Sequence, residues 1–449
     1  MAWEKFSAAP AKGGPGKSLA LPLGLSALWL GLIAAAAALT SFEEPYLPFA
    51  IAGAFVFFLR GLPSRWEVYS WLVASVVFVK IIHMPESPFW VLRVACGFAA
   101  LGFGALVVLG LRVLWSAQEG REHAVARLVP ALLLILFIFV SGRVLSFSGS
   151  ANPYTDDAWL YASDGTFGFQ PSFAVGRLLY HSLILTRCAL FTYLSLPFAM
   201  AVVCAWQVPA KQRRIPWHTL AVLLLAGVAG WICYNFVPGT GPLYAFGRDF
   251  PWHPLAYRDL PSFALHKMTL DLGIPRNAMP SLHVAWAVLL LWNSRGFPLV
   301  LRAALGLFVL LTVVATLGTG QHYLVDLAAS LPFALAVQGA ASYLLPNRSG
   351  RGRRLLAGLA LTGMWLVLVR YGVTLALKSP LIPWSLLLTS SAVTVWLEGK
   401  LMRGGDGRNA IGVAKLGGTG GSGAAAPIEM PDVRQIATRS RSKGQKAGG

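Results

Sequence analysis

Two short polar segments contain the residue types of this chain that could do chemistry. The first runs from Arg276 to His283 (RNAMPSLH) and the second from Gly318 to Asp326 (GTGQHYLVD). In the second segment, His322 and Asp326 lie four residues apart at an expected helix start, so they share one face of that helix. Asp326 can accept the Nδ1 proton of His322, which leaves Nε2 as a nucleophile or a base.

The first segment places a serine at the start of another expected helix. Ser281 follows a proline, and the free N–H groups at a helix start favour an anion there. His283, one turn inside, could protonate a leaving oxygen. In the second segment, Gly320 would let the backbone approach a ligand closely. Tyr323 could bond a phosphate oxygen or simply anchor its helix at the membrane interface.

Each motif has a simpler interpretation when it is taken alone. The His-x3-Asp pair could be a satisfied polar pair, and the Pro-Ser-x-His segment could be an ordinary helix cap. Because the two lie about 40 residues apart at two helix starts, we favour phosphoryl transfer. One histidine would attack phosphorus while the other protonates the departing alcohol. We expect no metal and no cofactor, since the Asp156-Asp157 pair has no further ligand at a suitable spacing.

The composition indicates the kind of scaffold that holds these segments. Of the 449 residues, 56% are hydrophobic and only 12% are charged, about half of the share in soluble proteins. This excludes a soluble globular enzyme, a disordered protein and a disulfide scaffold. Apolar runs near 20 residues predict membrane-spanning helices. We expect an all-α polytopic membrane protein with about 12 of them, at 19–39, 45–59, 68–82, 89–115, 126–147, 182–206, 217–237, 281–293, 299–318, 323–345, 355–377 and 381–397.

The net charge of +19 follows the alternation of the loops. One set of loops carries +13, the other set with its flanking span residues carries +1, and the tail from Glu398 carries +5. The positive-inside rule therefore predicts a multi-pass cell-membrane protein with both termini in the cytoplasm. Both polar segments then fall on the extracytoplasmic face, next to two long loops over 148–181 and 238–280. Scattered basic loops suit anionic lipid headgroups, so we expect no nucleic-acid partner.

The sequence around both segments resembles a known family. PSLH at 280–283 and HYLVD at 322–326 are similar to the second and third motifs of the type 2 phosphatidic acid phosphatase (PAP2) superfamily. The wider AMPSLHVAWA and TGQHYLVDL most resemble its inositol phosphotransferase branch, which includes inositol phosphorylceramide synthase-like enzymes. The resemblance implies a six-helix core over roughly 124–346. It also implies that His322 forms a phosphohistidine, that Asp326 orients it, and that His283 assists the leaving group without a metal.

The chain departs from the phosphatase pattern at two phosphate-binding positions. No basic pair precedes the loop near 238–242, and Thr316 stands where the third phosphatase motif has an arginine. The transferase branch tolerates both losses. Positive charge for a phosphate would then come from elsewhere on the external face. The candidates are Arg276, which we prefer although it could be an ordinary interfacial arginine, together with Lys267, Arg248 and Arg258.

These observations predict four regions and one activity. The regions are an N-terminal four-helix transmembrane region (1–123), a PAP2-like catalytic core (124–346), two additional transmembrane helices (347–400) and a disordered basic cytoplasmic tail (401–449). We expect transfer of a phosphoryl or phospho-headgroup group from a phospholipid in the bilayer to an alcohol. The alternatives are hydrolysis of phosphomonoester or diphosphate lipids with water as acceptor, a membrane transporter, or a non-catalytic lipid-binding protein. The sequence does not indicate an oligomeric state.

Overall fold

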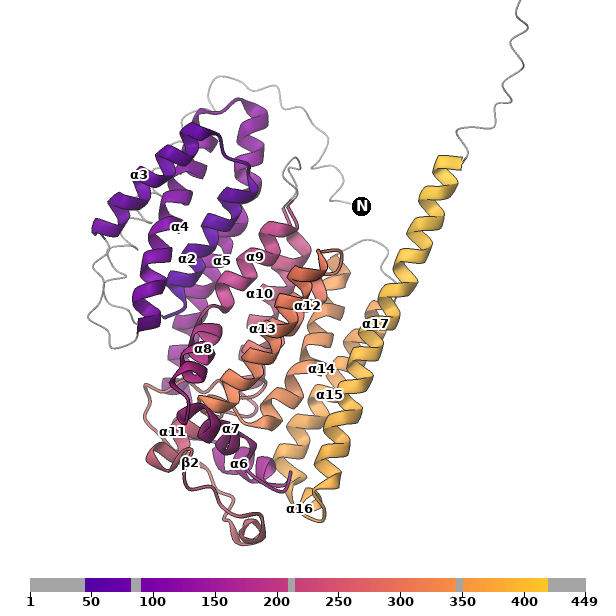
Figure 1. The fold of residues 1–449 in the computed structure, drawn as a ribbon. Coiled ribbons are helices and arrows are strands. Elements are labelled where there is room, and N and C mark those ends of the chain that lie inside the picture. Colours follow the sequence, from indigo (N-terminus) through magenta and orange to yellow (C-terminus); the bar gives the residue numbers. More distant parts are fainter. Residues whose placement is uncertain (1–44, 82–89, 209–214, 345–349, 419–449) are drawn as a thin grey trace, which may run out of the picture. The chain divides into compact units, whose positions relative to one another are not determined.

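The computed structural model describes residues 45–81, 90–208, 215–344 and 350–418, and most of them are helical (Figure 1). The chain divides after Glu398 into two units, and the helical bundle belongs to the first. The expected span over 19–39 lies outside the described residues, as does the tail beyond residue 418.

Three helices form the described part of the N-terminal region: α2 (Leu47–Arg60), α3 (Arg65–Ile81) and α4 (Trp90–Trp115). Helix α4 packs against both others. At Gly102 of α4, an added Cβ would overlap the backbone carbonyl of Ile51 in α2, so these two backbones touch. Small residues allow this close approach between helices in a membrane, where packing replaces the hydrophobic effect as the driving force.

The remaining long helices follow in chain order. They are α5 (Gln118–Ala151), α8 (Leu183–Leu194), α9 (Leu196–Trp206), α10 (Trp217–Tyr234), α12 (Leu282–Asn293), α13 (Leu299–Gly318), α14 (Leu324–Ala341), α15 (Arg351–Tyr371) and α17 (Leu381–Gly418). Helix α14 is the central one, because it packs against α10, α12 and α15. Of the apolar residues with which it could cross a membrane, 83% are buried inside the protein. The same measure is 22% for α13. The helix that begins beside His322 is therefore enclosed by protein.

The prediction of an all-α polytopic membrane protein is confirmed. Within the described residues, seven helices are long and apolar enough to cross a membrane. The expected span over 182–206 is a pair, α8 and α9, bent by 54°. The expected spans over 45–59, 68–82 and 281–293 coincide with α2, α3 and α12, which are 14, 17 and 12 residues long. Helix α17 continues to Gly418, past the boundary expected at residue 400.

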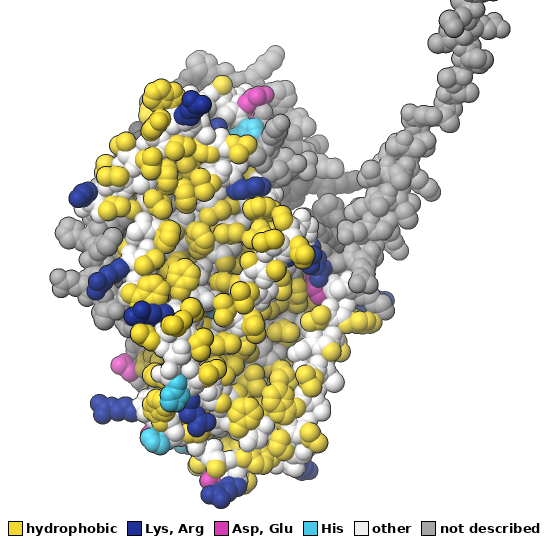
Figure 2. Space-filling model, viewed as in Figure 1, with side chains coloured by type: hydrophobic (Ala, Val, Ile, Leu, Met, Phe, Trp, Pro, Cys, Tyr) yellow, Lys and Arg dark blue, Asp and Glu magenta, His cyan; other side chains and the backbone are white. Residues whose placement is uncertain are grey.

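Short elements gather at one end of the helices and form a cap there (Figure 1). They are β1 (Tyr154–Thr155), α6 (Asp157–Gly165), α7 (Pro171–Tyr180), α11 (Pro242–Phe246), η2 (Gly247–Asp249), η3 (Tyr257–Ser262), β2 (Met268–Thr269) and α16 (Val373–Ala376), whereas η4 (Ser342–Leu344) follows α14. The two strands pair antiparallel, with Tyr154 opposite Thr269. Figure 2 shows hydrophobic side chains over most of the visible face, with scattered basic side chains and with acidic and histidine side chains at both ends.

A buried ion cluster ties α17 to the rest of the first unit. The Glu398 carboxylate lies 3.3 Å from the guanidinium of Arg354 and 3.3 Å from that of Arg295. Glu398 and Arg354 are both buried, whereas the Arg295 side chain is 32% exposed. A buried charge that loses its partner is costly, whereas an exposed pair contributes little.

We therefore expect Glu398→Ala to lower the free energy of unfolding by about 3 kcal/mol, because it leaves Arg354 buried without this carboxylate. Arg295→Ala should cost less than about 1 kcal/mol, since Glu398 keeps its buried partner. Denaturant titration of both variants in detergent micelles measures the two values. Equal losses would show that burial of the Glu398–Arg354 pair does not stabilise the fold.

Candidate active site

His322 is held in one orientation at the start of α14. Its Nδ1 lies 2.9 Å from the carbonyl oxygen of Ala278 and 3.4 Å from Oδ2 of Asp326. Both neighbours are acceptors, so Nδ1 carries the hydrogen and Nε2 keeps its lone pair. The Tyr323 N–H also donates to Asp326 Oδ2, at 2.8 Å. The side chain of His322 is therefore oriented as a nucleophile requires.

The structure brings the second expected histidine next to the first. The imidazole centroids of His283 and His322 are 6.5 Å apart, although 38 residues separate them in the chain. The ring of Tyr193 stacks on His283 at 3.8 Å, and the ring of Tyr46 lies 5.5 Å from it. Aromatic packing on one side of His283 leaves its ring fixed beside His322.

His283, but not His322, lines a cavity of about 380 Å³, which we call the polar cavity after the polar side chains in its lining. This volume falls in the range of small-molecule sites. Its lining includes eight polar side chains, from Tyr46, Ser141, Ser146, Tyr193, Tyr244, Asn277, His283 and Gln321. None of the described lining residues is a lysine or an arginine. The cavity therefore offers neutral hydrogen-bonding groups and a histidine rather than a fixed positive charge.

The starts of α12 and α14 are joined at this site. The N–H of Ser281 donates to the Asp326 carbonyl at 3.3 Å, and the Ser330 hydroxyl donates to the Ser281 carbonyl at 2.9 Å. The Ser281 hydroxyl is buried and has no hydrogen-bond partner among the described residues. The start of α12, with this unused hydroxyl, therefore favours an anion.

Arg276 has a different environment from that expected of a phosphate ligand. Its guanidinium is buried and donates to five backbone carbonyl oxygens. The acceptors are the carbonyl oxygens of Asn152, Pro153, Leu270, Asp271 and Ile274. These bonds hold the two long loops together. Because its donors are already used, Arg276 is placed as a loop clamp and not as a phosphate ligand.

The other expected cations lie on the surface of the cap. Lys267 is exposed and lies 6.0 Å from the ring centroid of Tyr154. Arg248 and Arg258 are also exposed, and Arg258 pairs with Asp259 at 3.7 Å. None of these three lines the cavity. Thr316, at the position of the phosphatase arginine, is fully buried, and its carbonyl accepts the N–H of His322 at 3.3 Å.

Gly320 has a positive φ of 71° and packs against the neighbouring loop. Its carbonyl accepts the N–H of Leu243 at 2.9 Å, and an added Cβ would lie 2.7 Å from the Phe250 ring. Across the contact, Gly241 has φ +96°, and its Cβ would overlap the carbonyl of Gln321. Both glycines are needed for the backbones to touch, so Gly320 supports the loop before His322.

Two aspartates of α6, which sequence reasoning did not select, hold this arrangement. The Asp157 carboxylate accepts hydrogen bonds from the N–H groups of Thr240 and Gly241 and from the Tyr323 hydroxyl, which lies 2.9 Å away. Tyr323, expected near a phosphate, is instead fully buried against Asp157. Their spacing in the sequence could have indicated this role, because Asp157 and Asp164 are seven residues apart and so share one face of α6.

Asp164 binds the start of α14 directly. Its carboxylate accepts the N–H of Leu324 at 2.9 Å and that of Val325 at 3.0 Å, and the Ser172 hydroxyl donates to it at 3.1 Å. Burial raises the pKa of Asp164 to about 7, although these hydrogen bonds act in the opposite direction. Burial likewise raises the pKa of Asp157.

One comparison with known protein families found a match to part of the chain. Residues 158–340 match the sequence model of the PAP2 superfamily, so this part of the chain is similar to that superfamily. No curated protein and no solved structure matches the chain. The resemblance seen in the two motifs is therefore confirmed at the level of the superfamily. The match supports a lipid function of the phosphatase or phosphotransferase type. The inositol phosphotransferase branch stays a prediction.

The raised pKa of Asp164 gives a pH-dependent stability. The ordinary pKa of an aspartate is 3.8, and that of Asp164 in the folded protein is about 7. Between these two pH values the folded protein keeps a proton on the Asp164 carboxyl, whereas the unfolded chain has released it. The contribution of this group is therefore fully present below about pH 4 and is lost as the pH rises through 7. Asp164→Asn should remove that dependence, so its stability relative to the wild type should rise by up to about 1.4 kcal/mol per pH unit between pH 5 and 7. Denaturant titration across this range measures it.

The exposed substitution Asp259→Asn serves as the control and should keep the wild-type slope. Parallel curves for the wild type and Asp164→Asn would contradict the raised pKa.

The contact between the two loops gives a further prediction. Gly241→Ala should lower the free energy of unfolding by about 3 kcal/mol or more, because the substitution adds an overlap with Gln321 to the strain of a positive φ. Gly296→Ala is the matched control, since Gly296 has φ +90° with nothing within 4 Å of an added Cβ. Its cost should be about 1–2 kcal/mol. Equal costs would mean that the loops can separate freely.

Proposed function

We propose that this membrane protein transfers a phospho-headgroup group from a phospholipid to an alcohol through a covalent intermediate on His322. The single observation that carries the proposal is the pair of imidazoles, His283 and His322, which lie 6.5 Å apart, with His283 in the lining of the polar cavity. The match of residues 158–340 to the PAP2 superfamily supports the coarser class, a lipid phosphatase or phosphotransferase.

The reaction has two balanced steps. In the first, the Nε2 lone pair of His322 attacks phosphorus, the bond from phosphorus to the lipid oxygen breaks, and that oxygen takes a proton from His283. In the second, His283 removes the proton of an acceptor hydroxyl, whose oxygen attacks phosphorus and releases His322. Asp326 keeps the Nδ1 hydrogen of His322 in place throughout and stabilises the positive ring.

The uncharged lining of the cavity favours headgroup transfer over hydrolysis of a phosphomonoester. A phosphomonoester carries up to two negative charges at neutral pH, whereas a phosphodiester carries one. Without lysine or arginine in the lining, the phosphate would depend on the lining hydroxyls and amides and on the Ser281 hydroxyl and N–H groups at the start of α12, the helix that carries His283. These weaker donors suit a single charge. The remaining polar side chains could bind a polyol headgroup such as an inositol.

The positive-inside rule puts this site on the extracytoplasmic face, and the cap that covers it contains both long loops predicted for that face. The acceptor would then be a lipid hydroxyl or a soluble alcohol that reaches the outer membrane surface. Water in the same position would give hydrolysis, so transfer and hydrolysis differ only in the occupant of the acceptor position.

The test is turnover of labelled phospholipids by purified protein, with and without inositol or ceramide. Transfer gives a new labelled lipid, whereas hydrolysis gives a labelled soluble product. We expect His322→Ala to lower turnover by at least about a thousandfold and His283→Ala by at least about a hundredfold, with the thermal transition retained. His253→Ala, at a position with a 76% exposed side chain, is the matched control and should keep wild-type turnover. Full activity of His322→Ala would overturn the proposal.

A further inference from the structure

A second, apolar cavity of about 240 Å³ lies between α5, α10 and α12, and we call it the α5–α10 groove. It is lined by Phe137, Val140, Ser141, Val144, Leu145, Gly227, Val228, Trp231, Leu282 and Trp286. Val140, Val228 and Trp231 are 47%, 59% and 40% exposed. Because α5 and α10 are long and apolar enough to cross a membrane, these exposed side chains would face hydrocarbon, and the groove would open into the bilayer.

The groove and the polar cavity share part of their lining. Ser141, Leu145 and Trp286 belong to both. On α5, the residues of the cavity (Ile138, Ser141, Gly142, Leu145, Ser146) and those of the groove (Phe137, Val140, Ser141, Val144, Leu145) form two stripes at helical spacing. The stripes are adjacent, so one helix forms a common wall between a polar cavity and an apolar groove.

Trp286 marks the boundary between the two spaces. Its Nε1–H donates to the Leu223 carbonyl at 3.0 Å, and the ring of Phe137 meets it edge to face at 5.7 Å. His283 lies one turn before it on α12. Gly227 keeps the floor of the groove open, because an added Cβ would lie 2.7 Å from the Phe137 ring. An apolar chain in the groove would therefore end within one helical turn of the catalytic histidine.

We propose that the α5–α10 groove binds an acyl chain of the phospholipid substrate while the headgroup occupies the polar cavity. This inference rests on the proposed function. A lipid could enter sideways from the bilayer, so its chain would never leave an apolar environment. From Leu145 to Phe137, the groove follows α5 for about 12 Å toward the membrane interior, at about 1.5 Å per residue. Ser141, the only one of its described lining residues with a hydroxyl, amide or charged side chain, is also shared with the cavity.

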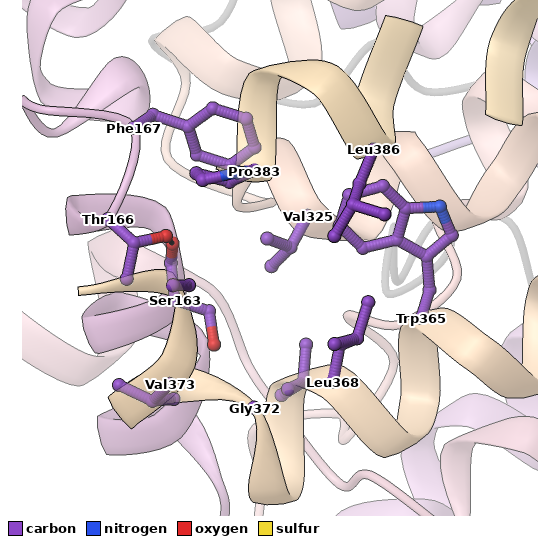
Figure 3. A pocket seen from close by; sticks show the side chains of 12 residues that line it. Ser163, Thr166, Phe167, Val325, Trp365, Leu368, Gly372, Val373, Pro383 and Leu386 are labelled. Carbon is purple, nitrogen blue, oxygen red and sulfur yellow. Dashed lines mark hydrogen bonds between the residues drawn. The ribbon is translucent and has the colours of Figure 1, made fainter. Parts of the chain in front are cut away.

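Two other cavities do not fit this role. The pocket between α6, α14, α15 and α17 in Figure 3 is lined by residues such as Thr166, Val325 and Trp365, but it holds only about 30 Å³, the space of one water. A cavity of about 300 Å³ between α2, α4, α9 and α13 is apolar, but it shares no lining residue with the polar cavity. Continuity with the catalytic site therefore distinguishes the α5–α10 groove.

Filling the groove tests the proposal. Val140→Trp and Val228→Trp place bulk in the groove from positions that face lipid, so the fold should tolerate both. The substrates are dioleoyl phosphatidylinositol and its water-soluble dibutanoyl form, which share a headgroup and differ in chain length. We expect the ratio of the long-chain KM to the short-chain KM to rise at least about tenfold in both variants, because only the long chain needs the groove.

Leu136→Trp is the matched control, since Leu136 is 57% exposed on α5 but does not line the groove. It should leave the KM ratio within about twofold of the wild type. A ratio that stays unchanged in both groove variants would overturn the proposal while leaving the proposed function intact.

A binding measurement tests the groove without turnover. Phosphatidylinositol and phosphatidic acid, each with a diazirine in one acyl chain, are added in trace amounts to phosphatidylcholine vesicles containing the His322→Ala variant. We expect photolabelling to concentrate in peptides with Val140 or Val228 and to fall when unlabelled lipid of the same headgroup is added. Peptides with the equally exposed Leu307 and Leu310 of α13 are the internal control. Equal labelling of both sets with both probes would overturn the proposal.

Discussion

The buried start of α14 is the constraint on which the rest of the site depends. The first N–H groups of a helix have no partner within it, and here they lie inside the protein where water cannot bind them. Asp326 accepts the N–H of Tyr323, and Asp164 accepts those of Leu324 and Val325. Three backbone donors are thereby fixed by two carboxylates. His322 directly precedes this turn, so its position follows from that capping.

The same constraint explains why the cap and the helices act together. Asp157 and Asp164 occupy one face of α6, so one short helix binds both the 240–241 loop and the start of α14. Arg276 clamps the two long loops through backbone carbonyls. The charges at this end of the protein therefore act mainly on the backbone, and the cavity beside them is left with neutral groups. A phosphate there would bind to hydroxyls, amides and the start of α12.

The N-terminal region has a role at the site that its sequence did not indicate. Pro45 and Tyr46, directly before α2, line the polar cavity, and Tyr46 lies against His283. Helix α5 supplies the wall shared by the cavity and the α5–α10 groove. All of these residues lie before the region that matches the superfamily. Transport would instead require polar groups near the middle of the spans. Here His283 and His322 lie at the starts of α12 and α14.

Much of the fold and the centre of the site could be predicted from the sequence. Long apolar runs predict membrane helices almost alone, and the two motifs predict that His283, His322 and Asp326 lie at two helix starts, where the structure brings the two imidazoles to 6.5 Å from each other. The roles of Arg276 and Tyr323 depend on contacts across the fold. Arg276 meets carbonyls more than 120 positions away, and Tyr323 meets an aspartate 166 positions away. The spacing of residues within one motif carries no information about such contacts. From the sequence alone, a buried aspartate on a short helix cannot be distinguished from one that is exposed to solvent.

The central claim is that His322 carries the transferred group, and the mass of that adduct tests it most directly. Purified protein is mixed with labelled phospholipid without an acceptor alcohol, quenched in alkali, digested and analysed by mass spectrometry. The account predicts an acid-labile adduct on the peptide that contains His322, with the mass of a phospho-headgroup group. An adduct on another residue, or steady turnover without any adduct on His322, would contradict it.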